Sequence, residues 1–196
     1  MTKSEKTRQL ILERAAALFN QKGYSGTSMS DIMKATGLTK GGLYGNFNSK
    51  EEISVAAFEH AVEIVNHKVG KRTYVIYNTI DKLKAVVYFY KEHIFNPPVA
   101  GGCPILNTSI EADDNNPKLK EKVVEALDYW HGRIVLTISK GIERKEMKPN
   151  VDADKFATCF IGTLEGGIMM ARIYKDGQKF DVLAEQLLQQ IELLKV

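Results

Sequence analysis

S-M-S-D-I-M-K-A-T-G-L-T-K-G-G-L-Y-G-N-F, residues 28–47, predicts two short helices joined by a tight turn. Ser28 begins a capping box, in which side chains and backbone N–H groups at a helix start hydrogen-bond each other. Thr39 can cap the second helix, and Gly37 lies in the turn between the two. This arrangement is a helix-turn-helix, which also occurs in proteins that never touch DNA.

The second short helix, expected over residues 40–47, contains three glycines, which are Gly41, Gly42 and Gly45. Each costs a helix roughly 1 kcal/mol relative to alanine. Leu43 and Phe47 are spaced four residues apart, so both can face a shared core. We therefore expect packing against neighbouring helices, rather than helix propensity, to hold this element.

Outside this stretch, apolar residues recur at spacings of three and four, which predicts an all-α protein of about nine helices. The expected helices are 7–22, 29–35, 40–47, 50–68, 79–95, 104–112, 117–144, one from Asp152 or Asp154 to 174, and 179–194. The segment 69–78 fits either a loop or a frayed helix. We expect a helix-turn-helix domain over residues 1–50 and a second helical domain over residues 51–196.

The positive charge is concentrated near the N-terminus. Residues 1–50 hold eight Lys or Arg against three acidic residues, whereas the remainder holds 19 against 21. A basic N-terminal quarter favours an anionic partner, although a solvated basic surface explains the charge equally well.

Cys103 and Cys159 have neither a paired spacing nor a metal-ligand pattern, and no cluster of His, Cys, Asp or Glu has one. We therefore expect no metal and no cofactor. The sequence has no signal-peptide pattern and no apolar run of 18 residues. We expect a cytoplasmic protein with reduced thiols and no membrane partner.

The sequence I-L-E-R-A-A-A-L-F-N-Q-K-G-Y-S-G-T-S-M-S-D-I-M-K-A-T-G-L-T-K-G-G-L-Y-G-N-F-N-S-K-E-E-I, residues 11–53, closely resembles the DNA-binding region of TetR-family transcriptional regulators. The resemblance implies a homodimer that binds a palindromic operator in double-stranded DNA. Half-sites would lie about 34–36 Å apart, or a multiple of that, with helix 40–47 in the major groove. It also implies a repressor that a small-molecule effector releases, although the sequence fits an activator as well.

By position, the resemblance assigns DNA contacts to Ser28, Thr39, Lys40, Gly41, Gly42, Tyr44, Asn46 and Lys50. Thr39, Tyr44 and Lys50 suit phosphate oxygens, and Lys40 could reach guanine O6 and N7. The glycines at 41 and 42 would let bare backbone approach the DNA. Gly45 stands where the family often has an aromatic residue, followed by His, so the operator sequence does not follow by analogy.

The resemblance also places a small-molecule site in the C-terminal domain, where binding moves the helix expected at 50–68. The residues that we expect near the effector are Tyr88, Phe89, His93, Cys103, Asn107, Glu111 and Trp130. Asn107 could instead bond a neighbouring backbone while Glu111 faces water, and Trp130 could belong to the core. Cys103 at a helix start is either a thiol of lowered pKa that senses electrophiles or oxidants, or a small buried residue.

The last two helices are expected to form the dimer interface, as a four-helix bundle with the partner. The residues assigned to it are Gly162, Gly166, Met169, Met170, Ile173, Leu187, Leu188 and Ile191. Glycines in mid-helix permit close approach of another helix, in the partner or within one chain.

Two alternatives differ in class from a DNA-binding regulator. One is an all-α small-molecule binding protein that has lost DNA binding, and the other is an all-α enzyme. The sequence contains no evident nucleophile–base pair, phosphate loop or paired carboxylates, so we expect no enzyme.

Overall fold

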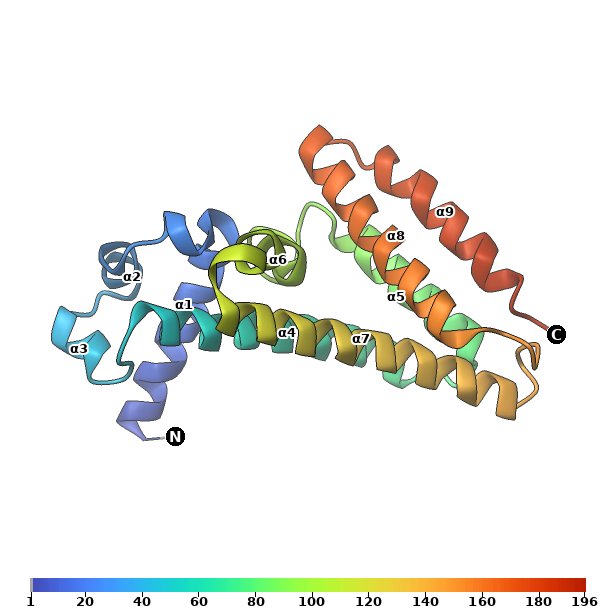
Figure 1. Ribbon diagram of the computed structural model, residues 1–196, viewed down its shortest axis with the longest axis horizontal. Coiled ribbons are helices and arrows are strands. Elements are labelled where there is room, and N and C mark those ends of the chain that lie inside the picture. Colours follow the sequence, from blue (N-terminus) through green and yellow to red (C-terminus); the bar gives the residue numbers. More distant parts are fainter. Residues whose placement is uncertain (1) are drawn as a thin grey trace. The chain divides into compact units, whose positions relative to one another are not determined.

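The computed structural model describes residues 2–196, apart from the side chains of residues 114 and 115. Within these residues it contains nine helices and no strand, so the predicted all-α class is confirmed (Figure 1). The helices are α1 (Lys3–Gly26), α2 (Met29–Thr36), α3 (Lys40–Tyr44), α4 (Lys50–Tyr74), α5 (Thr79–His93), α6 (Pro104–Asn115), α7 (Pro117–Glu143), α8 (Ala153–Tyr174) and α9 (Gln178–Glu192).

Side-chain caps determine where the helices of the helix-turn-helix begin. The predicted capping box is present, because Ser28 Oγ accepts from Asp31 N at 3.1 Å and Asp31 Oδ2 accepts from Ser28 N at 2.9 Å. Thr39 Oγ1 accepts from Gly42 N at 3.2 Å at the start of α3. Gly37 ends α2 with φ of 70°, a left-handed conformation that glycine adopts without strain.

Several helix ends differ from the prediction by a few residues, and two of the differences, at α3 and α4, bear on the candidate sites. Helix α3 ends at Tyr44 rather than at 47, because the next turn tightens and the N–H groups of Asn46 and Phe47 both bond the Leu43 carbonyl. Helix α4 continues through the undecided segment as far as Tyr74. Its last turn contains Lys71 and Arg72, whose positive charge suits the C-terminal end of a helix.

The chain divides into two compact units, and each has its own core. The first unit comprises residues up to 65 together with 98–126, and the second comprises 66–97 and 127–196. The first unit therefore extends well beyond residue 50, because α1 packs against α6 as well as against α2. No local sequence pattern predicts such contacts between distant segments.

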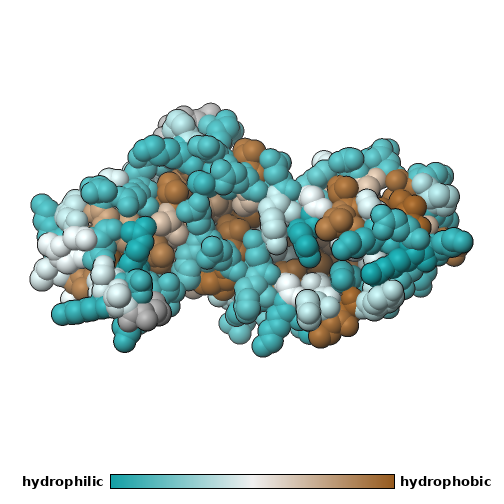
Figure 2. Space-filling view, turned by 90° about the horizontal axis from the view of Figure 1, so that it is seen from below, coloured by the Kyte–Doolittle hydropathy of each residue, from teal (hydrophilic) through white to brown (hydrophobic). Residues whose placement is uncertain are grey.

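The second unit is built around α5, α8 and α9, which lie side by side (Figure 1). Its most buried side chains include Phe160, Phe180, Leu187 and Ile191. By length and composition, α8 is the one described helix that could cross a membrane, but one of its faces packs on α9. The protein face in Figure 2 is mostly hydrophilic, with separate hydrophobic patches.

Candidate DNA-binding surface and effector cavity

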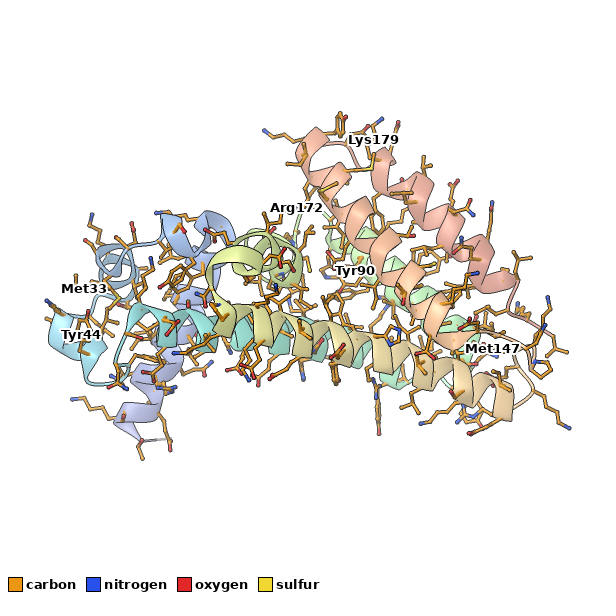
Figure 3. The ribbon with its side chains drawn as sticks, in the orientation of Figure 1. Met33, Tyr44, Tyr90, Met147, Arg172 and Lys179 are labelled. Carbon is orange, nitrogen blue, oxygen red and sulfur yellow. The ribbon has the colours of Figure 1, made fainter. Side chains whose placement is uncertain are left out.

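A small apolar core holds α2 and α3 in place within the first unit. Ile32 of α2 and Leu43 of α3 are completely buried, and Phe47 is 2% exposed. The burial of one side of α3 turns its other side outward, where Tyr44 is 44% exposed (Figure 3).

The residues expected to contact DNA are all exposed or half-buried. Ser28, Thr39, Lys40, Gly41 and Tyr44 are exposed, whereas Gly42, Asn46 and Lys50 are half-buried. All of them belong to the first unit. The structure thus brings the eight residues onto one connected segment, from the start of α2 to the start of α4.

The hydroxyl of Ser28 is already used within the protein. It lies 2.6 Å from Asp31 Oδ2, and Lys22 forms an ion pair with the same carboxylate at 3.3 Å. The hydrogen bonds from Ser28, with a smaller contribution from Lys22, hold the pKa of Asp31 far below its usual range. A permanent negative charge therefore stands at the start of α2, and Ser28 serves first as a helix cap.

Thr39, Lys40 and Tyr44 offer donors of the kind that phosphate groups accept. The Thr39 hydroxyl accepts from Gly42 N, so its own proton remains available for a second hydrogen bond. Lys40 Nζ lies 5.8 Å from the centre of the Tyr44 ring. Thr39 and Lys40 stand at the N-terminal end of α3, and Tyr44 is its last residue.

The fold itself does not require glycine at positions 41 and 42. Neither residue has a positive φ. A methyl group at Gly41 would meet nothing nearer than Thr39 Oγ1 at 4.0 Å, and one at Gly42 would make only ordinary contacts, the nearest at 3.5 Å. The absence of side chains here leaves α3 with an accessible backbone facing outward.

Arg8, which the sequence patterns did not single out, fixes the end of the α3 segment. Its guanidinium donates to the Asn46 carbonyl at 2.8 Å and lies 4.0 Å from the centre of the Phe47 ring. The Asn46 side chain donates back to the Gly42 carbonyl at 2.9 Å. Because Arg8 is 38 residues away from Asn46, no motif or periodicity could have indicated this contact.

Lys50 lies at the start of α4, with its Nζ atom 4.2 Å from the centre of the Tyr24 ring. This cation–π contact directs the lysine along one aromatic face without neutralising its charge. The charge is therefore available to an anion.

A cavity of about 120 Å³ lies inside the second unit, between α4, α5, α7 and α8. Its aromatic wall consists of Tyr90, Tyr129, Trp130 and Phe160. Figure 3 labels Tyr90 among the side chains of this unit. The indole N–H of Trp130 donates to Asn66 Oδ1 at 2.7 Å, and the ring meets Tyr90 edge-on at 6.2 Å between centroids.

The polar part of the cavity is positively charged. Lys82 and Arg133 line it, and none of its described lining residues is acidic. Burial, and then the positive charges of Arg133, Arg144 and Lys140, lower the pKa of Lys82. The nearby Glu146 carboxylate opposes this shift, and its Oε2 atom accepts from Thr79 N at 2.7 Å and from Thr79 Oγ1 at 2.5 Å.

Of the seven residues expected near the effector, Trp130 alone lines this cavity. Tyr88 is 43% exposed, whereas Phe89 is buried and stacks on His93 at 4.4 Å. From α5 the cavity is lined instead by residues that include Lys82, Val86 and Tyr90, at a spacing of four. That spacing was the signal available in the sequence.

Asn107 and Glu111 lie in the first unit, where they join α6 to the end of α1. The amide of Asn107 donates to the carbonyls of Asn20 and Gly101 at 3.0 and 3.1 Å. Glu111 accepts from Tyr24 N at 2.5 Å and from Ser25 N at 3.1 Å. The two side chains therefore hold backbone groups together, as the structural alternative for Asn107 anticipated, and Glu111 does not simply face water.

Cys103 precedes α6 in the first unit and is 6% exposed. Its side chain makes no capping hydrogen bond to the helix. This burial favours the interpretation of a small core residue at a helix start over that of a reactive sensor. No group of three His, Cys, Asp or Glu side chains within the described residues could hold a metal ion.

The residues expected at a dimer interface fall into two groups. Met169 and Ile173 on α8 are 47% and 78% exposed, and Gly162 and Gly166 have open space where a side chain would stand. Met170 is also exposed and Leu188 is half-buried. In contrast, Leu187 and Ile191 on α9 are almost completely buried, because they fill the core of their own unit. These two side chains are therefore not on a surface that a partner could cover.

Comparison with known proteins finds two family models that together match most of the chain. Residues 11–57 match the family described as bacterial regulatory proteins, tetR family, and residues 79–187 match the tetracyclin repressor-like C-terminal domain.

A TetR transcriptional regulator from Chloroflexus aurantiacus is 42% identical with a TM-score of 0.95, over 100% of this chain and 98% of that one. A TetR-family regulator from Cytophaga hutchinsonii is 36% identical with a TM-score of 0.92, over the same shares. An uncharacterised HTH-type transcriptional regulator from Bacillus subtilis, YxaF, is 26% identical over 95% of this chain and 96% of its own.

The Glu146 carboxylate predicts an acid-dependent loss of stability. Hydrogen bonds from Thr79 lower its pKa in the folded protein, so its stabilising effect is complete above the ordinary carboxyl value of 4.5 and is lost as the pH falls through the lower folded value. We expect Glu146→Gln to lower the urea midpoint at pH 7, and the difference from wild type to disappear in strong acid. Glu185→Gln, at an exposed position of α9, is the control. A difference that is constant with pH would contradict the assignment.

Proposed function

We propose a mode of action for this chain, which belongs to the TetR family of bacterial transcriptional regulators. This mode of action explains how the ligand-responsive DNA-binding regulator engages its operator and its effector. Helix α3 would enter the major groove of double-stranded DNA. The cavity of the second unit would hold a small-molecule effector, and two chains would bind one palindromic site as a repressor. The place of action would be the cytoplasm.

The observation that carries the DNA-binding part is the bare, outward backbone of α3 at Gly41 and Gly42. The fold gains nothing from glycine there, and each glycine lowers helix stability. Close approach of a phosphate or a base edge gives these positions a physical reason. Thr39 and Tyr44 would then bond phosphates, and Lys40 would reach base edges.

Helix α4 supports a route by which an effector could act on the DNA-binding segment. It begins at Lys50, directly after the α3 segment, and its residues Asn66, Val69 and Thr73 line the cavity. An effector would shift the equilibrium only if it bound one position of α4 more tightly than the other. Release of the operator would follow from binding to the form with low affinity for DNA.

The exposed stripe on α8 supports the homodimer. Gly162, Gly166, Met169 and Ile173 follow one another at helical spacing along that stripe. A second copy of α8 could approach closely at the glycines, and the methionine side chain would adapt to its surface.

Replacement of Gly41 by alanine should separate folding from DNA binding. We expect Gly41→Ala to leave the unfolding free energy unchanged or raise it by up to about 1 kcal/mol, because alanine favours helix. The added methyl group should weaken binding to the operator at least about tenfold by holding the DNA away. Fluorescence anisotropy with a labelled duplex that carries the operator measures the affinity.

Gly132→Ala is the matched control, because Gly132 lies on α7 with open space around it. Unchanged operator affinity in Gly41→Ala would contradict the proposed close approach.

Lys50→Ala should remove one phosphate contact. We expect weaker binding to every duplex tested and a decrease of about one in the slope of log affinity against log salt. A titration from low to moderate salt, with the operator and with an unrelated duplex, measures both effects. Altered sequence preference at an unchanged salt slope would show that Lys50 does not bind phosphate.

Two charges placed on the α8 stripe should split the homodimer. We expect Met169→Glu with Ile173→Glu to sediment as a monomer that keeps its helical circular dichroism, because both side chains are exposed in the single chain. The control is a pair of glutamates at Val75 and Tyr77, which are 81% and 73% exposed outside α8. A dimer of unchanged stability in the α8 variant would place the interface elsewhere.

A further inference from the structure

We infer that the cavity of the second unit binds a small aromatic acid, with its carboxylate between Lys82 and Arg133 and its ring against Trp130 and Tyr90. This inference rests on the proposed function for its regulatory meaning, because it names the chemical class of the effector. The binding itself is a separate claim that can be measured without DNA.

The charge of the cavity selects an anion. Lys82 and Arg133 both line it, no described lining residue is acidic, and neither cation takes part in any of the ion pairs among the described residues. Lys82 is half-buried and Arg133 is exposed, so the cost of an unpartnered charge falls on Lys82. The lowered pKa of Lys82 is the sign of that cost, because burial and the surrounding cations both disfavour its charged form. A bound carboxylate would relieve it.

The nearest acidic group does not pair with Lys82. Glu146 attracts Lys82 less than the neighbouring cations repel it, it forms no ion pair with Lys82 among the described residues, and its Oε2 atom accepts from the N–H and hydroxyl of Thr79. Arg144, another cation near Lys82, donates to the Tyr77 carbonyl and lies over the Tyr77 ring. Lys82 and Arg133 therefore face the cavity with an excess of positive charge.

The size and wall of the cavity select the apolar part of the ligand. Its volume of about 120 Å³ is comparable to the roughly 150 Å³ of an apolar cavity that accepts benzene. Four aromatic side chains contribute to the wall, and the hydrogen bond to Asn66 fixes the orientation of Trp130. Aromatic rings pack favourably edge to face or offset, so a single aromatic ring fits this wall well.

Trp130 is the chain's only tryptophan, so its fluorescence reports occupancy of the cavity directly. Three probes of nearly equal shape separate charge from size: 3-phenylpropanoate, its neutral amide 3-phenylpropanamide, and the cation 3-phenylpropylamine. The full-length chain is titrated with each probe, and calorimetry checks the fluorescence result. We expect the acid to bind at least about tenfold more tightly than the amide, and the amine to bind most weakly, since a charge-assisted hydrogen bond is about twice as strong as a neutral one.

Variants of the two cations locate the carboxylate. We expect Lys82→Gln and Arg133→Gln each to weaken the acid about tenfold and to leave the amide unchanged. Lys68→Gln is the matched control, because Lys68 is an exposed residue of α4 in the same unit and does not line the cavity. Its loss changes the net charge equally and should leave binding of the acid unchanged.

The inference is overturned if none of the three probes changes the Trp130 signal or gives heat, if the amide or the amine binds as tightly as the acid, or if Lys68→Gln weakens the acid as much as Lys82→Gln. Operator affinity is measured on the same preparations with and without the acid. Charge-selective binding that leaves operator affinity unchanged would support the inference and contradict the cavity's proposed regulatory role. If the protein binds its operator normally but does not bind the acid in a charge-selective way, the inference is contradicted and the proposed DNA-binding function still stands.

Discussion

The burial of Leu43 and Phe47 is the constraint on which the DNA-binding surface depends. Helix α3 has only five residues, and two of them are glycines, so it could not persist as an isolated helix. Its apolar side is held by the core of the first unit, and Arg8 fixes the turn that follows it. This attachment frees the opposite side from any part in folding, and the outward backbone can be used for recognition.

The cavity of the second unit combines apolar packing with positively charged side chains. Its aromatic wall combines the buried Tyr90 and Phe160 with the exposed Tyr129, and two cations, the half-buried Lys82 and the exposed Arg133, line it without acidic neighbours among its described lining residues. Core packing alone would favour an apolar residue in place of Lys82. The cost of partly burying the Lys82 charge is explained if an anion occupies the cavity during part of the protein's regulatory cycle.

The local sequence was sufficient for much of the fold. Caps at Ser28 and Thr39 located the helix-turn-helix, and apolar spacing located nine helices, because both signals act within a few residues. The predictions that failed depended on contacts between segments that are far apart in the sequence. The end of α1 is held by Glu111, the end of α3 by Arg8, and Leu187 and Ile191 face their own core, and no local pattern encodes these partners.

The predictions of site residues also differ according to whether they depend on a local pattern or on distant segments. The resemblance could assign candidate DNA contacts by position because the whole segment is one contiguous motif. It could not assign the residues that line the cavity, because four helices line it and the choice of face on each depends on the others. On α5 the expected residues Tyr88, Phe89 and His93 do not line the cavity, whereas Lys82 and Tyr90 do.

The open space around Gly41 has a consequence for how such proteins diversify. A side chain added at position 41 would meet nothing nearer than 4.0 Å in its own chain, so an exchange there costs little in folding, and under the proposed contact selection on it would act almost entirely through the DNA. Operator preference can then change by single substitutions on α3 while the core behind it stays the same. This separation lets one architecture acquire new target sequences without passing through unstable intermediates.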